Sequence, residues 1–254
     1  MLDMTIGAQA PDAQARTKWV NGCALTAKEA CSGFNLSGAD LSSRSMPGSD
    51  LSDANLSGAD LSLGNFDASN MSGSNLSGAA LGAAKLRRVS FAGADLSGSS
   101  LSDALLGSAD LTSADLSWAD LSGADLSAAT VGSANFTEAV LTGAKLKSVD
   151  LRFSILTRVQ SGSTTGTPKG LPAGWKLARG HLIGSSANLR GADLRSVDFG
   201  TTNLTGANLA GAKVSGAKLS KAQLTGAVLT GLVGRPASIP SGWAISSAGN
   251  LAKR

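Results

Sequence analysis

The sequence predicts an all-β solenoid, a rod of short stacked units, on the basis of three observations. An apolar residue recurs at every fifth position from Leu36 to Leu156 without a gap, in 25 consecutive units. The position two residues before it usually holds Gly, Ala or Ser, and Asp or Asn often stands directly before it. A period of five fits neither the 3.6 residues of a helical turn nor the two-residue alternation of a strand. The chain must therefore turn once in each unit.

The unit contains what such a turn requires. Asp, Asn and Ser favour turns through side-chain to backbone hydrogen bonds, and Gly tolerates the positive φ that many turns need. A single unit cannot bury its apolar residue alone, so the units must stack on one another. A second run of the same period extends from Leu189 to Leu229. Because Leu156 and Leu189 are not separated by a multiple of five, the register breaks between the two runs.

The repeating pattern A-(D/N)-L-(S/T)-G resembles the unit of the pentapeptide-repeat family. This resemblance implies a right-handed quadrilateral β-helix, in which four units make one coil and the leucines stack inward in four ladders. For this chain it implies about eight coils in two blocks. We divide the chain into an N-terminal segment and cap, a first repeat block, an insertion, a second repeat block and a C-terminal tail, at residues 1–35, 36–156, 157–188, 189–231 and 232–254.

One motif follows each repeat block. It reads GTPKGLPAGWKL at residues 166–177 and GRPASIPSGWAI at residues 234–245, or G-x-P-x-x-(L/I)-P-x-G-W-x-(L/I). Two prolines and a glycine beside one tryptophan predict a stiff loop whose indole packs on the solenoid. The alternative is a recognition loop that presents Trp175 or Trp243 to a partner.

The N-terminal segment contains Thr26-Ala27-Lys28-Glu29, which fits a capping box and predicts a short helix near residues 27–31 that covers the first coil. Cys23 and Cys31, the two cysteines, form either a disulfide or two free thiols. The stretch from Met1 to Val20 lacks the apolar run of a signal peptide, and no later segment reaches transmembrane length. We therefore expect a cytoplasmic protein, or a secreted one if the native N-terminus is longer and the disulfide forms.

No catalytic, metal or cofactor motif accompanies the repeats. His181, the one histidine, has no carboxylate or cysteine near it in the sequence, which favours a polar surface residue of the insertion. The glycines follow the five-residue period, and none belongs to a phosphate-binding or dinucleotide-binding fingerprint. We therefore expect no enzyme activity, no cofactor, no metal and no small-molecule substrate.

Charge is distributed unevenly along the chain. Residues 36–156 hold 7 Lys or Arg against 13 Asp or Glu, whereas residues 157–254 hold 12 against 2. An acidic stretch without Lys or Arg extends from Val89 to Ala144. In the pentapeptide-repeat family, some members mimic duplex DNA with an acidic solenoid and bind DNA gyrase. The candidate partner-binding residues are Asp95, Asp110, Asp115, Asp120, Asp125 and the outward Trp118.

The acidic residues also have a structural explanation, because Asp is the preferred turn-forming residue of the unit. The sequence therefore favours a non-enzymatic structural or protein-interaction scaffold whose protein partner is not specified. The alternative is an inhibitor or protector of DNA gyrase or topoisomerase that acts by DNA mimicry through the acidic residues.

Overall fold

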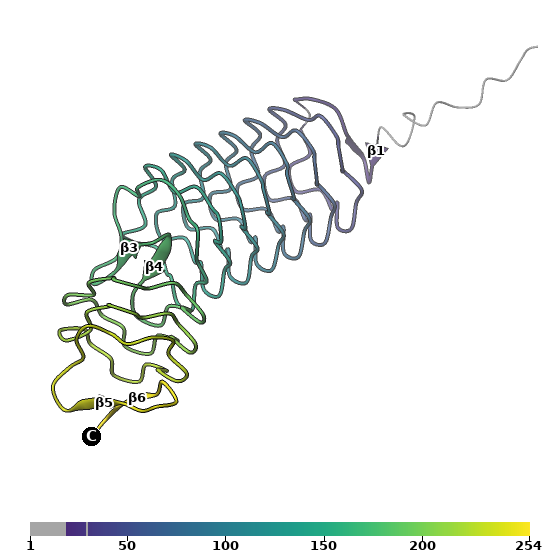
Figure 1. The fold of residues 1–254 in the computed structure, drawn as a ribbon. Helices are drawn as coiled ribbons and strands as arrows, with labels where there is room; N and C mark the ends of the chain where they lie inside the picture. The colour runs from purple at the N-terminus through teal and green to yellow at the C-terminus, as the bar shows by residue number, and fades with distance from the viewer. Residues whose placement is uncertain (1–18, 29) are drawn as a thin grey trace, which may run out of the picture.

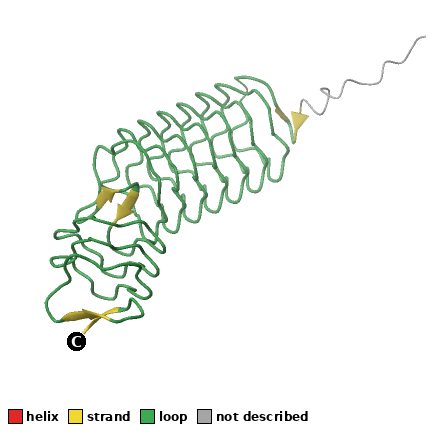
Figure 2. Cartoon of the chain, in the orientation of Figure 1, coloured by secondary structure: helices red, strands yellow, loops and turns green. Residues whose placement is uncertain are grey.

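The computed structural model describes residues 19–28 and 30–254 and shows an elongated stack of coils (Figure 1). Within these residues there is no helix, and most of the chain consists of turns and single β-bridges (Figure 2). Six short strands form three antiparallel hairpins: β1 (Trp19–Val20) with β2 (Cys23–Ala24), β3 (Lys176–Ala178) with β4 (His181–Ile183), and β5 (Trp243–Ile245) with β6 (Leu251–Lys253). The fold is the β-helix solenoid that the repeat predicts.

Parallel β-bridges join each unit to the fourth unit after it, so four units complete one coil. The bridges form four columns, which we call faces 1 to 4 in the order of the units from Asn35 onward. Their first bridges within residues 30–65 are Asn35↔Asn55 on face 1, Asp40↔Asp60 on face 2, Ser45↔Asn65 on face 3 and Ala30↔Asp50 on face 4. Faces 1 and 3 are opposite each other, as are faces 2 and 4.

Peptide hydrogen bonds hold neighbouring coils together. The Leu36 N–H donates to the Asn55 carbonyl at 2.7 Å, and the Asn55 N–H donates back to the Phe34 carbonyl at 2.9 Å. At the end of the unit the Ala39 N–H donates to the Leu36 carbonyl at 3.1 Å, which closes a turn. Gly38, the residue before Ala39, has a φ of 64°, a conformation that glycine adopts without strain. The same pattern recurs in most of the following units.

The large residues at the centre of the units are buried along the axis of the rod. Leu116 and its equivalents have almost no exposed surface, and most of the small residues two positions before them are buried as well. Leu63 and Trp118 are exposed because they occupy the positive-φ turn position, which points away from the axis. The buried residues form two clusters, one that ends at Leu182 and one that begins at Ile183.

The two clusters meet at the insertion, which interrupts most of the cross-section of the stack. On face 2, Gln160 bridges Asn188, a longer separation in sequence than the four units between other bridge partners. Beside it, at the corner between faces 1 and 2, the Arg158 N–H donates to the Ser186 carbonyl at 2.9 Å. Among the described residues no bridge continues the other faces across this point, where the hairpin β3–β4 lies instead. The axis of the stack changes direction there (Figure 1).

The prediction of a helix near residues 27–31 is wrong. Glu29 lies outside the described residues, but the residues on either side of it are not helical. Lys28 has a φ of 64°, which no α-helix contains, and Ala30 forms a β-bridge with Asp50. Cys31 is fully buried, and its N–H donates to the Asp50 carbonyl at 2.7 Å, as the leucine N–H groups do in later units. Stacking on the neighbouring coil has overridden the local capping signal. A disulfide joins Cys31 to Cys23 in the hairpin β1–β2.

We predict that Leu116→Asp abolishes the cooperative unfolding of the native rod or lowers its free energy of unfolding by more than about 3 kcal/mol, since a buried carboxylate there has no partner. Thermal unfolding followed by circular dichroism measures the effect. Leu63→Asp is the matched control, because Leu63 is 65% exposed and its replacement should change stability little. Equal melting temperatures for the two variants would contradict the assignment of Leu116 to the core.

We predict that reduction of the Cys23–Cys31 disulfide lowers the free energy of unfolding by about 2 kcal/mol, because the bond closes a short loop in the unfolded chain. Urea denaturation with and without dithiothreitol measures this difference. The double variant Cys23→Ser, Cys31→Ser should lose the dependence on reductant, and a dependence that persisted would assign the effect to another cause.

Candidate functional site

The acidic residues proposed for partner binding lie around the rod and not along one face. Asp110 is on face 4, Asp120 on face 2 and Asp125 on face 3, whereas Asp95 and Asp115 are bridge partners on face 1. Each is half-buried. The structure therefore brings together Asp95 and Asp115 as stacked neighbours and places the other three on separate sides of the coil.

Each of these carboxylates stabilises its own turn. Oδ1 of the aspartate accepts the backbone N–H two residues later, at 2.9 Å from Ser117 to Asp115 and at 3.0 Å from Ser127 to Asp125. Partial burial raises the pKa of Asp125, but hydrogen bonds from Ser127 and the charge of Lys145 outweigh it, so the pKa lies below its ordinary value. These aspartates are turn residues, and their abundance follows from the fold.

Trp118 lies at the corner between faces 1 and 2, where its side chain is 64% exposed. Its φ of 56° shows that it occupies the turn position that glycine fills in many other units. The indole projects from the corner of the coil between the units of Asp115 and Asp120. It is an isolated exposed aromatic residue, since the neighbouring corner positions one coil away are Gly98 and Glu138.

A basic surface that the sequence analysis missed lies on face 3. The four-unit period gathers basic side chains there from coils far apart in the sequence, and the acidic residues on the same face are only Asp67, Asp125 and Asp193 within the described residues. The basic residues that define this surface, which we call the basic face, are Lys28, Lys85, Arg87, Arg88, Lys145, Lys147, Arg195, Lys213 and Arg235.

The acidic residues neutralise the basic face only in part. Arg87 lies 3.8 Å from Asp67 and Lys145 lies 3.6 Å from Asp125, both in exposed pairs that contribute little to stability. Among the described residues several other side chains of the face make no ion pair and are exposed to solvent: Lys85, Arg88, Lys147, Lys213 and Arg235. Faces 1 and 2 hold more acidic than basic residues, so the rod has charged sides of opposite sign.

The repeated proline and tryptophan motif has the same geometry in both copies. The backbone N–H of Trp175 donates to the Pro172 carbonyl at 3.0 Å, and the backbone N–H of Trp243 donates to the Pro240 carbonyl at 3.2 Å. A β-hairpin follows each turn. The Trp175 indole is half-buried and packs against both hydrophobic clusters, so it connects the cores on the two sides of the insertion. This packing supports a structural role for Trp175.

We predict that Gly184→Ala destabilises the rod by roughly 1–3 kcal/mol. A Cβ at Gly184 would lie 2.0 Å from a ring carbon of Trp175, so the indole would have to leave its position between the cores. Gly132→Ala is the matched control, because nothing lies within 4 Å of a Cβ there. Urea denaturation followed by tryptophan fluorescence compares the two variants. Equal midpoints would show that Trp175 does not depend on this contact.

The described residues contain no group of three His, Cys, Asp or Glu side chains arranged to hold a metal ion. His181 is half-buried in β4, and its Nδ1 donates to the Ser161 carbonyl at 2.8 Å, so its ring is held by the solenoid backbone. No helix long and apolar enough to cross a bilayer occurs in the part of the chain that the structure describes.

These features define a class of protein, a solenoid of stacked five-residue units with charged outer faces. The sequence profile of pentapeptide repeats matches the chain in eight copies, over residues 35–73, 74–112, 90–127, 134–160, 185–220 and 202–231. These segments together cover more than half of the chain, which therefore belongs to the pentapeptide-repeat family. That family is defined by its repeat and not by a catalytic activity.

Several solved structures are similar to this chain. HetL from the cyanobacterium Nostoc sp. strain PCC 7120, a pentapeptide-repeat protein involved in heterocyst differentiation regulation, is 28% identical. The match covers 81% of this chain and 86% of HetL, with a TM-score of 0.31. A second pentapeptide-repeat protein from Nostoc, alr5209, is 35% identical over 34% of this chain and 69% of its own, with a TM-score of 0.32.

A trypsin-treated form of QnrB1, a plasmid-mediated fluoroquinolone resistance protein, is 19% identical to this chain. The match covers 72% of this chain and 88% of QnrB1, with a TM-score of 0.40. No curated protein matches. The assignment to the family therefore depends on the repeat profile.

Proposed function

We propose that this protein is a non-enzymatic interaction scaffold, a rod of about eight coils in two blocks that binds a protein partner through a charged side. The observation that carries the proposal is the basic face. Its exposed Lys and Arg side chains come from many coils, and on each side of the insertion the bridges of face 3 stack these coils in register. A preorganised array of like charge attracts a partner of opposite charge and orients it during encounter.

The Cys23–Cys31 disulfide bears on the compartment in which the scaffold acts. Disulfides persist in oxidising compartments and are rare where thiols are kept reduced. The bond closes the hairpin β1–β2 at the start of the stack. We propose an oxidising compartment for this protein, with the cytoplasm as the alternative, in which the two thiols would be free.

The second candidate function is DNA mimicry toward DNA gyrase or topoisomerase. Its support is the stack of Asp95 on Asp115 on face 1, together with Glu138 at the next corner. A mimic of duplex DNA needs a continuous acidic side, because the duplex presents about one charge per 1.7 Å of its axis. Asp110, Asp120 and Asp125 lie on other faces and do not extend this side, so the scaffold is the better supported function.

We predict that reversing the charge of three residues on the basic face abolishes binding of a partner that the wild-type protein retains. The test is affinity capture with immobilised protein from a lysate of the source cells at low and moderate salt. The variant Lys85→Glu, Arg87→Glu, Arg88→Glu should lose the salt-sensitive partner, since electrostatic attraction between exposed charges weakens as ionic strength rises. Mass spectrometry of the retained proteins compares the variants.

The matched control is the triple variant Asp110→Lys, Asp115→Lys, Asp120→Lys, which also changes three charges but on faces 1, 2 and 4. Loss of the partner in this control alone would favour the acidic residues, and a supercoiling assay with purified DNA gyrase would then test mimicry directly. The same captured proteins on wild-type, basic-face and acidic-residue variants would contradict both functions.

A further inference from the structure

An open surface pocket of about 530 Å³, which we call the cavity, lies beside the hairpin β3–β4 at the corner between faces 2 and 3. It is lined by Ser161 and Ser163 from the coil before the hairpin β3–β4, by Arg179 and His181 from the hairpin itself, and by Arg190 and Asp193 from the coil after it. The scaffold function does not involve this cavity. Its lining combines the one histidine of the chain with two arginines.

The turn of β3–β4 makes the cavity by separating two coils. In regular coils the N–H of the turn residue donates to a carbonyl of the next coil, as Gly143 does to Gly162 at 2.7 Å. At Ser163 the hairpin lies in the way, and a Cβ at Gly180 would be 2.8 Å from the Ser163 nitrogen. Within the hydrogen bonds of the described residues, the Ser163 N–H has no acceptor.

The C-terminal hairpin β5–β6 is an internal comparison, because it occupies the same position on its coil. The Leu232 N–H donates to the Gly249 carbonyl at 2.9 Å, as the Thr164 N–H donates to the Gly180 carbonyl at 3.2 Å. Leu251 in β6 is a buried leucine and corresponds to Leu182 in β4. The two hairpins can therefore be compared residue by residue.

The comparison identifies the group that the cavity lacks. At the C-terminal hairpin, the Gly231 N–H donates to Oδ1 of Asn250 at 2.9 Å. Gly231 corresponds to Ser163, and Asn250 corresponds to His181. The imidazole offers no acceptor to Ser163 from Nδ1, since Nδ1 carries a proton that it donates to the Ser161 carbonyl at 2.8 Å. An oxygen atom that accepts the turn N–H is present in one copy and missing from the other.

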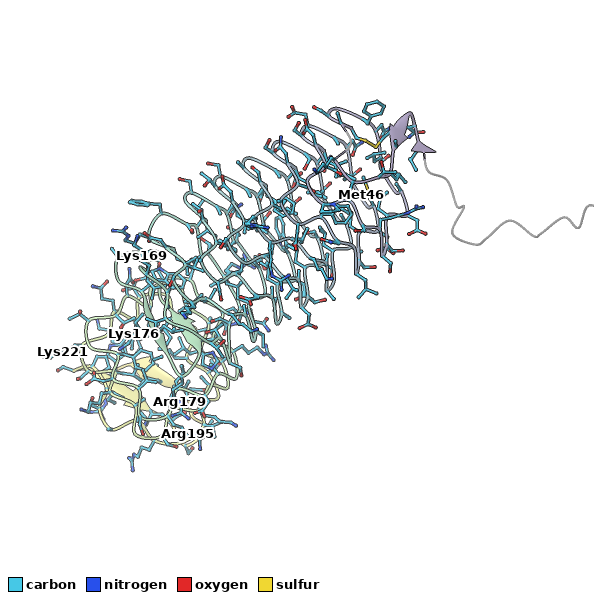
Figure 3. All side chains as sticks on the ribbon, turned by 90° about the horizontal axis from the view of Figure 1, so that it is seen from above. Met46, Lys169, Lys176, Arg179, Arg195 and Lys221 are labelled. Atoms are coloured by element: carbon cyan, nitrogen blue, oxygen red, sulfur yellow. A yellow bond between two sulfur atoms is a disulfide. The ribbon has the colours of Figure 1, made fainter. Side chains whose placement is uncertain are left out.

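The charges around the cavity favour an anion. Asp193 is its one acidic lining residue, and Arg179 and Arg195 bind this carboxylate at 2.8 Å and 2.7 Å. The two arginines are labelled in Figure 3. The hydrogen bonds from Arg195 and then Arg179 hold the pKa of Asp193 well below its ordinary value, so it is ionised and already compensated. Arg190 is exposed and makes no ion pair within the described residues.

We propose that the cavity binds a phosphate group, free or as part of a small phosphorylated molecule. A phosphate oxygen takes the place that Oδ1 of Asn250 has at the other hairpin and accepts the Ser163 N–H. The Arg190 guanidinium donates to the remaining oxygens, because arginine suits planar, two-pronged recognition of phosphate. The hydrogen bond from Nδ1 to the Ser161 carbonyl keeps the His181 ring oriented beside the site.

The test is titration of the isotope-labelled full chain with inorganic phosphate and, separately, with adenosine monophosphate, followed by NMR at constant ionic strength in chloride. Saturable shifts of the Ser163 amide and the His181 ring are expected. Stronger binding of the monophosphate would assign the site to a phosphorylated molecule, and stronger binding of inorganic phosphate would assign it to the free ion. Shifts at Ser163 that never saturate with either probe would overturn the proposal.

Two variants sharpen the test. His181→Asn copies the C-terminal hairpin and should satisfy the Ser163 N–H internally, so the protein stays folded while phosphate affinity falls roughly tenfold or more. Arg190→Ala should weaken binding by a similar factor. Lys221→Ala is the matched control, because it removes an exposed positive charge that lies neither in the cavity lining nor on the basic face. Equal weakening in all three variants would reduce the effect to general charge attraction and overturn the site.

Discussion

The hydrogen bond between a peptide group and the neighbouring coil is the interaction on which the whole molecule depends. It recurs along the stack from the Cys31 N–H bonded to the Asp50 carbonyl onward, and it fixes the side of the rod on which each residue lies. The pairing of each unit with the unit one coil later determines which leucines are buried, where the aspartates stabilise turns and which basic residues share a face. The surroundings of a residue therefore depend on its position within the coil more than on its immediate neighbours in sequence.

The fold was predictable from the sequence because the units repeat the same turn and bury their central residue in the same way. The ladder positions such as Leu116 and the turn role of Asp115 were predictable from a period of five and from turn chemistry. The helix near residues 27–31 was predicted wrongly, since the capping box is a local signal and the pairing of Cys31 with the coil of Asp50 is not. Tertiary packing decides such conflicts.

The surfaces were harder to predict than the core. Charge counted along the chain does not reveal the basic face, because the solenoid sorts charged residues around its axis. A count over the period of one coil would have found it. The cavity beside His181 had no such signal. It exists because the turn of β3–β4 enters between two coils, which depends on the length of the insertion and on the close approach of Gly180 to Ser163.

The bridges on faces 1, 3 and 4 stop at the hairpin β3–β4, yet face 2 continues past it from Gln160 to Asn188. A hairpin that covers only part of the cross-section does not end the solenoid. The uncovered face still pairs with the next coil, and the stack continues from there. The chain contains two hairpins of this kind, because the same proline and tryptophan motif precedes both β3–β4 and β5–β6.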